Sequence, residues 1–173
     1  ELLPDYAAAW NNLGDAQLTS GDLEAATDSL QKAISRKSDL FPAHVNLGKI
    51  HLLYGNIEKA VSCYDEAISI APDNPLLYFI KGTTLLENGK IAEAREALNK
   101  IIPLDAGYPD VYRQIALTYY YQGAHDKMLE VYHTTCSCNP DDELHNLGLL
   151  SCIMDYVSGP DPAEGFDVHR RFG

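Results

Sequence analysis

The feature that most constrains this chain is an internal repeat of 34 residues. When the sequence is shifted against itself by that length, the segments that begin at Trp10, His44 and Tyr78 align, and the first two end in Leu-Gly. The same shift aligns four glycines: Gly21, Gly55, Gly89 and Gly123. Each unit reads as two apolar helices joined by its glycine turn. Because one helix pair cannot bury its apolar face alone, the units are expected to stack on their neighbours.

Small residues recur where the two helices of a unit are expected to meet. Position 8 of the unit holds Gly14, Gly48, Gly82 and Ala116, and position 20 holds Ala26, Ala60, Ala94 and Met128. Glycine inside a helix costs about 1 kcal/mol relative to alanine, so we expect a close helix-helix approach at position 8. The second helix then carries Leu30, Tyr64, Leu98 and Tyr132 at position 24, and Ala33, Ala67, Ile101 and Thr135 at position 27.

This pattern resembles the tetratricopeptide repeat, whose motif places a large residue, Leu-Gly, an aromatic, Gly, Ala, an aromatic, Ala and Pro at these positions. The resemblance covers four repeats, 7–40, 41–74, 75–108 and 109–142. The departures are Gln17 and His51 for an aromatic, Lys81 for Leu, Met128 for Ala, and Ser38 and Ala106 for Pro. The implied fold is an all-α tetratricopeptide-repeat solenoid, a right-handed superhelix of antiparallel helix pairs.

Both ends of the chain are expected to differ from the repeats. Residues 1–6 match the end of a preceding repeat, so the face around Trp10 is expected to lack a neighbour and to favour self-association. Residues 143–157 continue an apolar stripe and are predicted to form a C-terminal capping helix. Residues 158–173 open with a Gly- and Pro-containing break, which predicts a linker or the start of a following domain.

The first helices of such an array line a concave groove, which helical spacing assigns to positions 2, 5, 6, 9, 12 and 13 of each unit. The candidate peptide-binding residues are Asn12, Asp15, Asn46, Lys49, Phe79, Arg113, Gln114, Tyr120 and Tyr121. A row of carboxamides can bind the backbone of an extended peptide; Asn12 and Asn46 begin such a row and Ile80 interrupts it. The alternative is that both asparagines are solvated surface residues and that the tyrosines only cover the adjoining helix.

Composition and motifs argue against other functional classes. A net charge of -12 without a basic stripe disfavours nucleic acid, and no apolar run reaches the roughly 18 residues of a membrane span. Irregularly spaced cysteines favour reduced thiols and a cytoplasmic location. A zinc site at His133, Cys136 and Cys138 lacks a second cysteine pair. Without a phosphate loop, a Ser nucleophile elbow or Cys-x-x-Cys, we expect no catalytic residue, metal or cofactor in this chain.

The segment 149–173, LLSCIMDYVSGPDPAEGFDVHRRFG, resembles the one that joins repeats to the catalytic region in bacterial relatives of the O-linked N-acetylglucosamine transferases and SPINDLY-like proteins. The shared order is an apolar stretch ending in Tyr, an Asp-Pro turn and a His-Arg-Arg-aromatic-Gly helix. This resemblance implies that the repeats recognise protein substrates for a larger glycosyltransferase, whose nucleotide-sugar domains would begin after Gly173. The alternative is a free-standing adaptor that binds peptides or assembles complexes. Either way, the expected partner is a protein or peptide.

Overall fold

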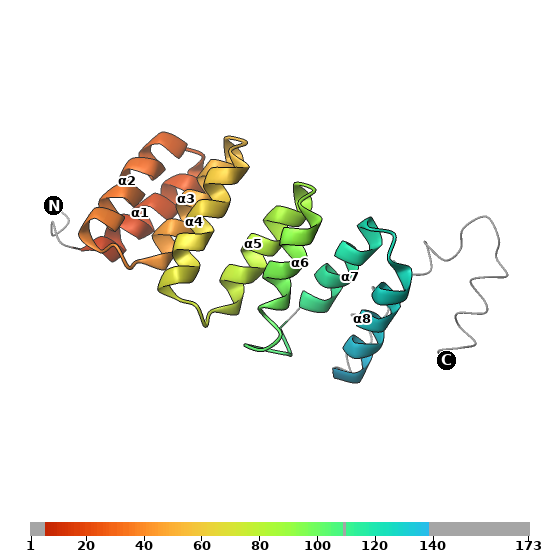
Figure 1. Cartoon of the computed structure of the whole chain (residues 1–173). Helices are drawn as coiled ribbons and strands as arrows, with labels where there is room; N and C mark the ends of the chain where they lie inside the picture. Colours follow the sequence, from red (N-terminus) through yellow and green to blue (C-terminus); the bar gives the residue numbers. More distant parts are fainter. Residues whose placement is uncertain (1–5, 109, 139–173) are drawn as a thin grey trace. The chain divides into compact units, whose positions relative to one another are not determined.

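The computed structural model of this chain describes residues 6–108 and 110–138, with side chains as far as Val131 and at Thr134. The helices of this part are α1 (Ala7–Ser20), α2 (Leu23–Arg36), α3 (Phe41–Leu53), α4 (Ile57–Ile70), α5 (Pro75–Glu87), α6 (Ile91–Asn99), α7 (Val111–Tyr121) and α8 (His125–Cys138) (Figure 1). Because the described residues contain no strand, the predicted all-α class is confirmed. The predicted capping helix 143–157, the linker 158–173 and residues 1–5 of the N-terminal remnant lie outside them.

The chain divides into two compact units, Glu1–Leu104 and Asp105–Gly173. In the first unit, α1 packs on α2, α3 on α4 and α5 on α6, and successive pairs meet through α2 with α3 and α4 with α5. The first helices of neighbouring pairs also touch, since α1 contacts α3. In the second unit, α7 packs on α8. The helix-pair organisation therefore follows the 34-residue period of the sequence.

The aligned glycines make the turn within each pair. Gly21, Gly55, Gly89 and Gly123 have φ values of +85°, +73°, +75° and +69°, a left-handed conformation that side chains disfavour. In the first of these turns the Asp22 amide donates to the Gln17 carbonyl oxygen at 2.9 Å, which closes the end of α1. The side chain of Asp22 then accepts from the Ala25 amide at 3.1 Å and begins α2.

The glycines at position 8 allow the paired helices to approach closely, as expected. A Cβ atom at Gly14 would lie 2.7 Å from Leu30 Cγ, and one at Gly82 would lie 2.6 Å from Leu98 Cγ. At Gly48 it would overlap the ring of Tyr64, with the Cζ atom at 2.9 Å. Even one methyl group at these positions would collide with the facing helix.

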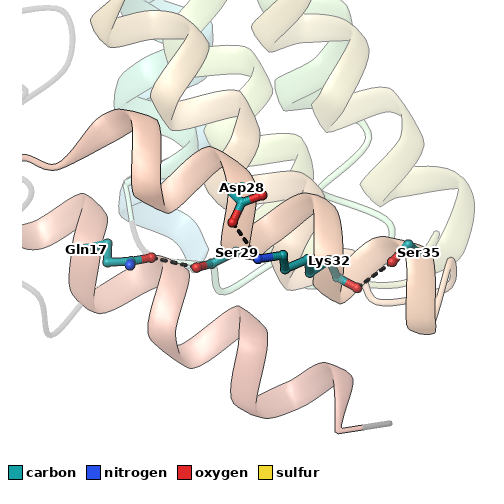
Figure 2. A network of polar contacts seen from close by, with 5 residues as sticks. All are labelled: Gln17, Asp28, Ser29, Lys32 and Ser35. Atoms are coloured by element: carbon teal, nitrogen blue, oxygen red, sulfur yellow. Dashed lines mark hydrogen bonds and ion pairs between the residues drawn. The ribbon is translucent and has the colours of Figure 1, made fainter. Parts of the chain in front are cut away.

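Gln17, one of the departures from the motif, replaces an aromatic contact by a polar one (Figure 2). The hydroxyl of the buried Ser29 donates to Gln17 Oε1 at 2.7 Å, so α1 and α2 are joined by a hydrogen bond. One turn further along α2, Lys32 Nζ pairs with Asp28 at 2.6 Å and lies 4.8 Å from the centre of the Trp10 ring. The lysine thus covers the side chain at position 4, where the motif has its large residue.

The second helix of the third repeat ends earlier than its counterparts. We expected Ile101 on this helix at position 27, but α6 stops at Asn99 and Ile101 is buried in the turn that follows. The reason is Pro103, which lacks an amide hydrogen and disfavours helical geometry at Ile102. The expectation for Ile101 was therefore wrong about the helix and correct about the burial.

Candidate functional site

Four polar side chains of α1 and α3 form one connected chain, and Asn11, Asn12, Asn46 and Lys49 are together termed the amide chain. Lys49 Nζ donates to Asn46 Oδ1 at 3.2 Å. Asn46 Nδ2 donates to Asn11 Oδ1 at 3.4 Å, which connects the two helices. Asn11 Nδ2 then donates to Asn12 Oδ1 at 3.4 Å. Each carboxamide oxygen therefore accepts from the preceding member of the chain.

Helical spacing explains how these residues meet. Asn46 and Lys49 are three residues apart on α3 and share one of its faces. Asn11 and Asn12 are adjacent on α1, which contacts α3. The amide chain therefore results from two neighbouring first helices, in which position 6 of the second repeat (Asn46) meets position 5 of the first (Asn11).

Asn46 differs from its predicted environment. It is only 5% exposed, whereas Asn12 and Lys49 are exposed and Asn11 is half-buried. A buried carboxamide must keep its hydrogen bonds, because an unsatisfied polar group costs about 1–3 kcal/mol. Asn46 satisfies this need through Lys49 and Asn11, so the alternative of a solvated surface residue is wrong for it. Asn12 is the asparagine of the predicted pair that remains accessible to a partner.

The other candidates of the first unit lie on α1 and α5. Asp15 is exposed one turn after Asn12, and Phe79 is half-buried on α5. Ile80, at the repeat position of Asn46, packs against a buried apolar cluster that includes Val45. The row of carboxamides therefore ends at α3 in this unit.

The remaining candidates belong to the second unit and lie on α7. Arg113 Nε donates to Asp110 Oδ1 at 2.9 Å beside the start of the helix, and Gln114 is half-buried. Tyr120 and Tyr121 are 37% and 62% exposed, and their rings meet edge to face with centroids 5.5 Å apart. Tyr120 and Tyr121 therefore form an accessible surface of the second unit.

Two features of the first unit were not identified from the sequence. Asn11 joins the two halves of the amide chain; its position 5 lies on the predicted groove face, which was the available signal. Lys81, treated only as a departure from Leu, pairs with Asp65 at 2.5 Å and lines a surface hollow of about 260 Å³ between α4, α5 and α6. The complementary charge at Asp65, in the preceding repeat, was the signal for this pair.

The groups with shifted pKa values lie outside the amide chain. Burial, helped by the charge of Lys59, lowers the pKa of His51, and burial next to Glu66 raises the pKa of the Cys63 thiol. Burial raises the pKa of Tyr64 to about 12, partly offset by the nearby Thr84. Burial is the largest cause of all three shifts, so they reflect the packing of these side chains.

Other kinds of site find little support in the part of the chain that the structure describes. No three His, Cys, Asp or Glu side chains come together there in a way that could hold a metal ion. None of its helices combines the length and the apolar character that crossing a membrane requires. The side chains of His133, Cys136 and Cys138 lie outside the description.

Comparison with known sequences matches the repeats. Models of the tetratricopeptide repeat match residues 7–40, 41–74 and 63–96, which together make up more than half of the 173-residue chain. Comparison with curated proteins finds no match.

Solved structures share the fold at low sequence identity. The structure of MamA protein is 21% identical with a TM-score of 0.70, covering 95% of this chain and 92% of that chain. TTC0263, a thermophilic tetratricopeptide protein of Thermus thermophilus, is 20% identical with a TM-score of 0.65, covering 86% and 81%. The Yersinia enterocolitica type III secretion chaperone SycD, in complex with a peptide of the translocator YopD, is 21% identical with a TM-score of 0.62, covering 70% and 98%. These similarities show the all-α solenoid fold.

Proposed function

Because the chain belongs to the tetratricopeptide-repeat family, we propose that it binds an extended segment of a protein partner on the α1 and α3 face that carries the amide chain. The proposal rests on one observation: hydrogen bonds connect exposed polar side chains of this face to a buried carboxamide, which fixes their positions. Asn12 and Lys49 are accessible, and both are connected to Asn46 inside the protein. Groups fixed in this way lose less conformational freedom when a partner binds, so more of the interaction energy remains as affinity.

The chemistry of this face suits a peptide backbone. An extended segment that is not paired with other strands presents carbonyl oxygens and amide hydrogens along its length. Asn12 and Lys49 can donate to the oxygens, and the carboxylate of Asp15 can accept from the hydrogens. The complex of SycD with a YopD peptide supports peptide binding by a protein of this fold.

We include Phe79 on α5 in the proposed binding surface of the first unit, and we propose that Arg113, Gln114, Tyr120 and Tyr121 on α7 form a separate partner-binding surface of the second unit. The exposed tyrosines would supply rigid contact area of the kind found at interface centres. The role of the repeats as the substrate-recognition region of a larger O-linked glycosyltransferase remains a prediction from residues 149–173, which lie outside the described residues. A free-standing adaptor would use the same face.

Self-association through the outer face of α1 is a further part of the proposal. Leu13 is 36% exposed, whereas Leu47, its counterpart in the next repeat, packs against a buried cluster that includes Ala33. Leu13 thus exposes apolar surface at a repeat position that is packed inside the protein in the next repeat. Such exposed apolar surface favours contact with another molecule. Sedimentation of the protein and of Leu13→Glu tests this; equal concentration dependence of the two would exclude this face as the contact.

The binding test uses an acetylated and amidated dodecapeptide of alternating serine and threonine, measured by calorimetry. Asn12→Ala should weaken binding about fivefold, because one hydrogen bond contributes about 1 kcal/mol. Asn99→Ala, which makes the same change at an exposed position on α6, is the matched control and should leave the affinity unchanged. Equal affinities of Asn12→Ala and the unmodified protein would remove this face as the site.

A further inference from the structure

The amide chain has a fixed direction because one of its members can only donate. Lys49 Nζ carries hydrogens and no acceptor, so the Asn46 atom that it meets at 3.2 Å must be the oxygen. Asn46 then turns its nitrogen to Asn11, whose oxygen lies 3.4 Å away. Asn11 in turn directs its own nitrogen to Asn12 Oδ1 at 3.4 Å. A carboxamide without such neighbours can exchange the positions of its oxygen and nitrogen at little cost. Here the ammonium group of Lys49 determines the orientation of all three carboxamides.

Both ends of the amide chain consequently offer hydrogens to a partner. Within the described residues, nothing accepts a hydrogen bond from Asn12 Nδ2. Lys49 Nζ has three hydrogens and gives one of them to Asn46. The oxygens of Asn11, Asn12 and Asn46 each already accept one hydrogen bond from the preceding member, whereas Asn12 Nδ2 donates none to the described residues. The burial of Asn46 opposes reversal, because turning its carboxamide would place two donors against each other.

We propose that Lys49 is a positioning residue that orients the amide chain, so that Asn12 binds main-chain carbonyl oxygens of the extended partner and makes no demand on the partner's amide hydrogens. This inference rests on the proposed function and deepens it, since the face is the same. It differs from a row of free carboxamides, in which each side chain donates and accepts at once. Asp15 lies outside the amide chain and contributes separately.

The orientation is tested first without any partner, in Lys49→Met and Lys49→Arg. Methionine keeps a long side chain but has no donor, whereas arginine keeps both donor and charge. In nitrogen-proton NMR spectra, Lys49→Met should shift the side-chain amide signals of Asn46, Asn11 and Asn12 and speed their hydrogen exchange, and Lys49→Arg should not. Unchanged signals in Lys49→Met would refute the positioning role, whether or not a peptide binds.

The selectivity is tested with two uncharged probes, the serine-threonine dodecapeptide and an analogue in which an ester oxygen replaces every second amide N–H. The ester form loses donors and keeps all carbonyl oxygens, so in Asp15→Ala, which lacks the carboxylate acceptor of this face, we expect the two to bind within about threefold of each other. Lys49→Met should bind both about fivefold more weakly, and Lys49→Arg should restore binding. If the dodecapeptide binds Asp15→Ala and its ester analogue binds this variant more than about tenfold more weakly, the amide chain needs partner amide hydrogens and the inference is wrong. If neither binds the unmodified protein, the proposed function fails for this peptide class while the NMR result still decides the role of Lys49.

Discussion

Replacing Gly48 by alanine should destabilise the protein, although alanine is the better helix former. The new methyl group would overlap the Tyr64 ring, with the Cζ atom at 2.9 Å. Tyr64 is 1% exposed and is packed in a cluster with Val45, Ala60 and Leu77, so the ring has no free space into which to move. The substitution therefore sets a gain in helix propensity against a collision in the core.

The two contributions can be compared. Alanine instead of glycine inside a helix gains about 1 kcal/mol. Overpacking a well-packed core costs about 1–3 kcal/mol, and a rigid, fully buried ring belongs at the upper end of that range. We therefore expect Gly48→Ala to lower the free energy of unfolding by about 1–2 kcal/mol.

The measurement is urea unfolding followed by far-ultraviolet circular dichroism, with Gly48→Ala introduced into the unmodified protein and into Tyr64→Val. Valine removes the ring atoms that the new methyl group would meet, so in that background Gly48→Ala should stabilise by about 1 kcal/mol. The slope of free energy against urea is compared as well, because repeat proteins can unfold in parts. A loss of the same size in both backgrounds would show that the Tyr64 ring is not the cause.

Three further substitutions test other contacts of the first unit. Tyr64→Phe should leave stability unchanged or raise it by up to about 1 kcal/mol in urea unfolding, because no described residue forms a hydrogen bond of good geometry with the buried hydroxyl; a loss above about 1 kcal/mol would contradict this. Lys81→Leu should change stability by less than about 1 kcal/mol or raise it, since Asp65 is half exposed and stays solvated without the lysine; a large loss would show that the ion pair stabilises the protein more than exposed pairs do. The lowered pKa of His51 means that the unfolded chain takes up a proton before the folded one, so stability should fall as the pH drops below about 6.5. His51→Gln should flatten that part of a melting-temperature profile, and an unaltered profile would assign the pH dependence to other groups.

The fold could be predicted because its main determinants are local. A glycine turn with positive φ and a glycine against a large residue of the facing helix leave a direct trace in the sequence, as at Gly55 and Gly48. The early end of α6 was missed because the repeat pattern was extended over Pro103, whose effect on the backbone outweighs the period. Local chemistry was therefore the better guide wherever it disagreed with the repeat.

The candidate site was harder to predict because equivalent repeat positions have different neighbours. Asn12, Asn46 and Ile80 share position 6, yet they are exposed, 5% exposed and half-buried, respectively. Helical spacing gives the direction in which a side chain leaves its helix, but the adjacent helices decide whether water or a partner can reach it. The bond from Asn46 to Asn11 joins residues 35 positions apart and exists only because α1 lies against α3. A groove position therefore becomes a candidate contact only when its side chain keeps an accessible hydrogen-bonding group, and Asn12 meets that condition through its exposed Nδ2 whereas the buried Asn46 does not.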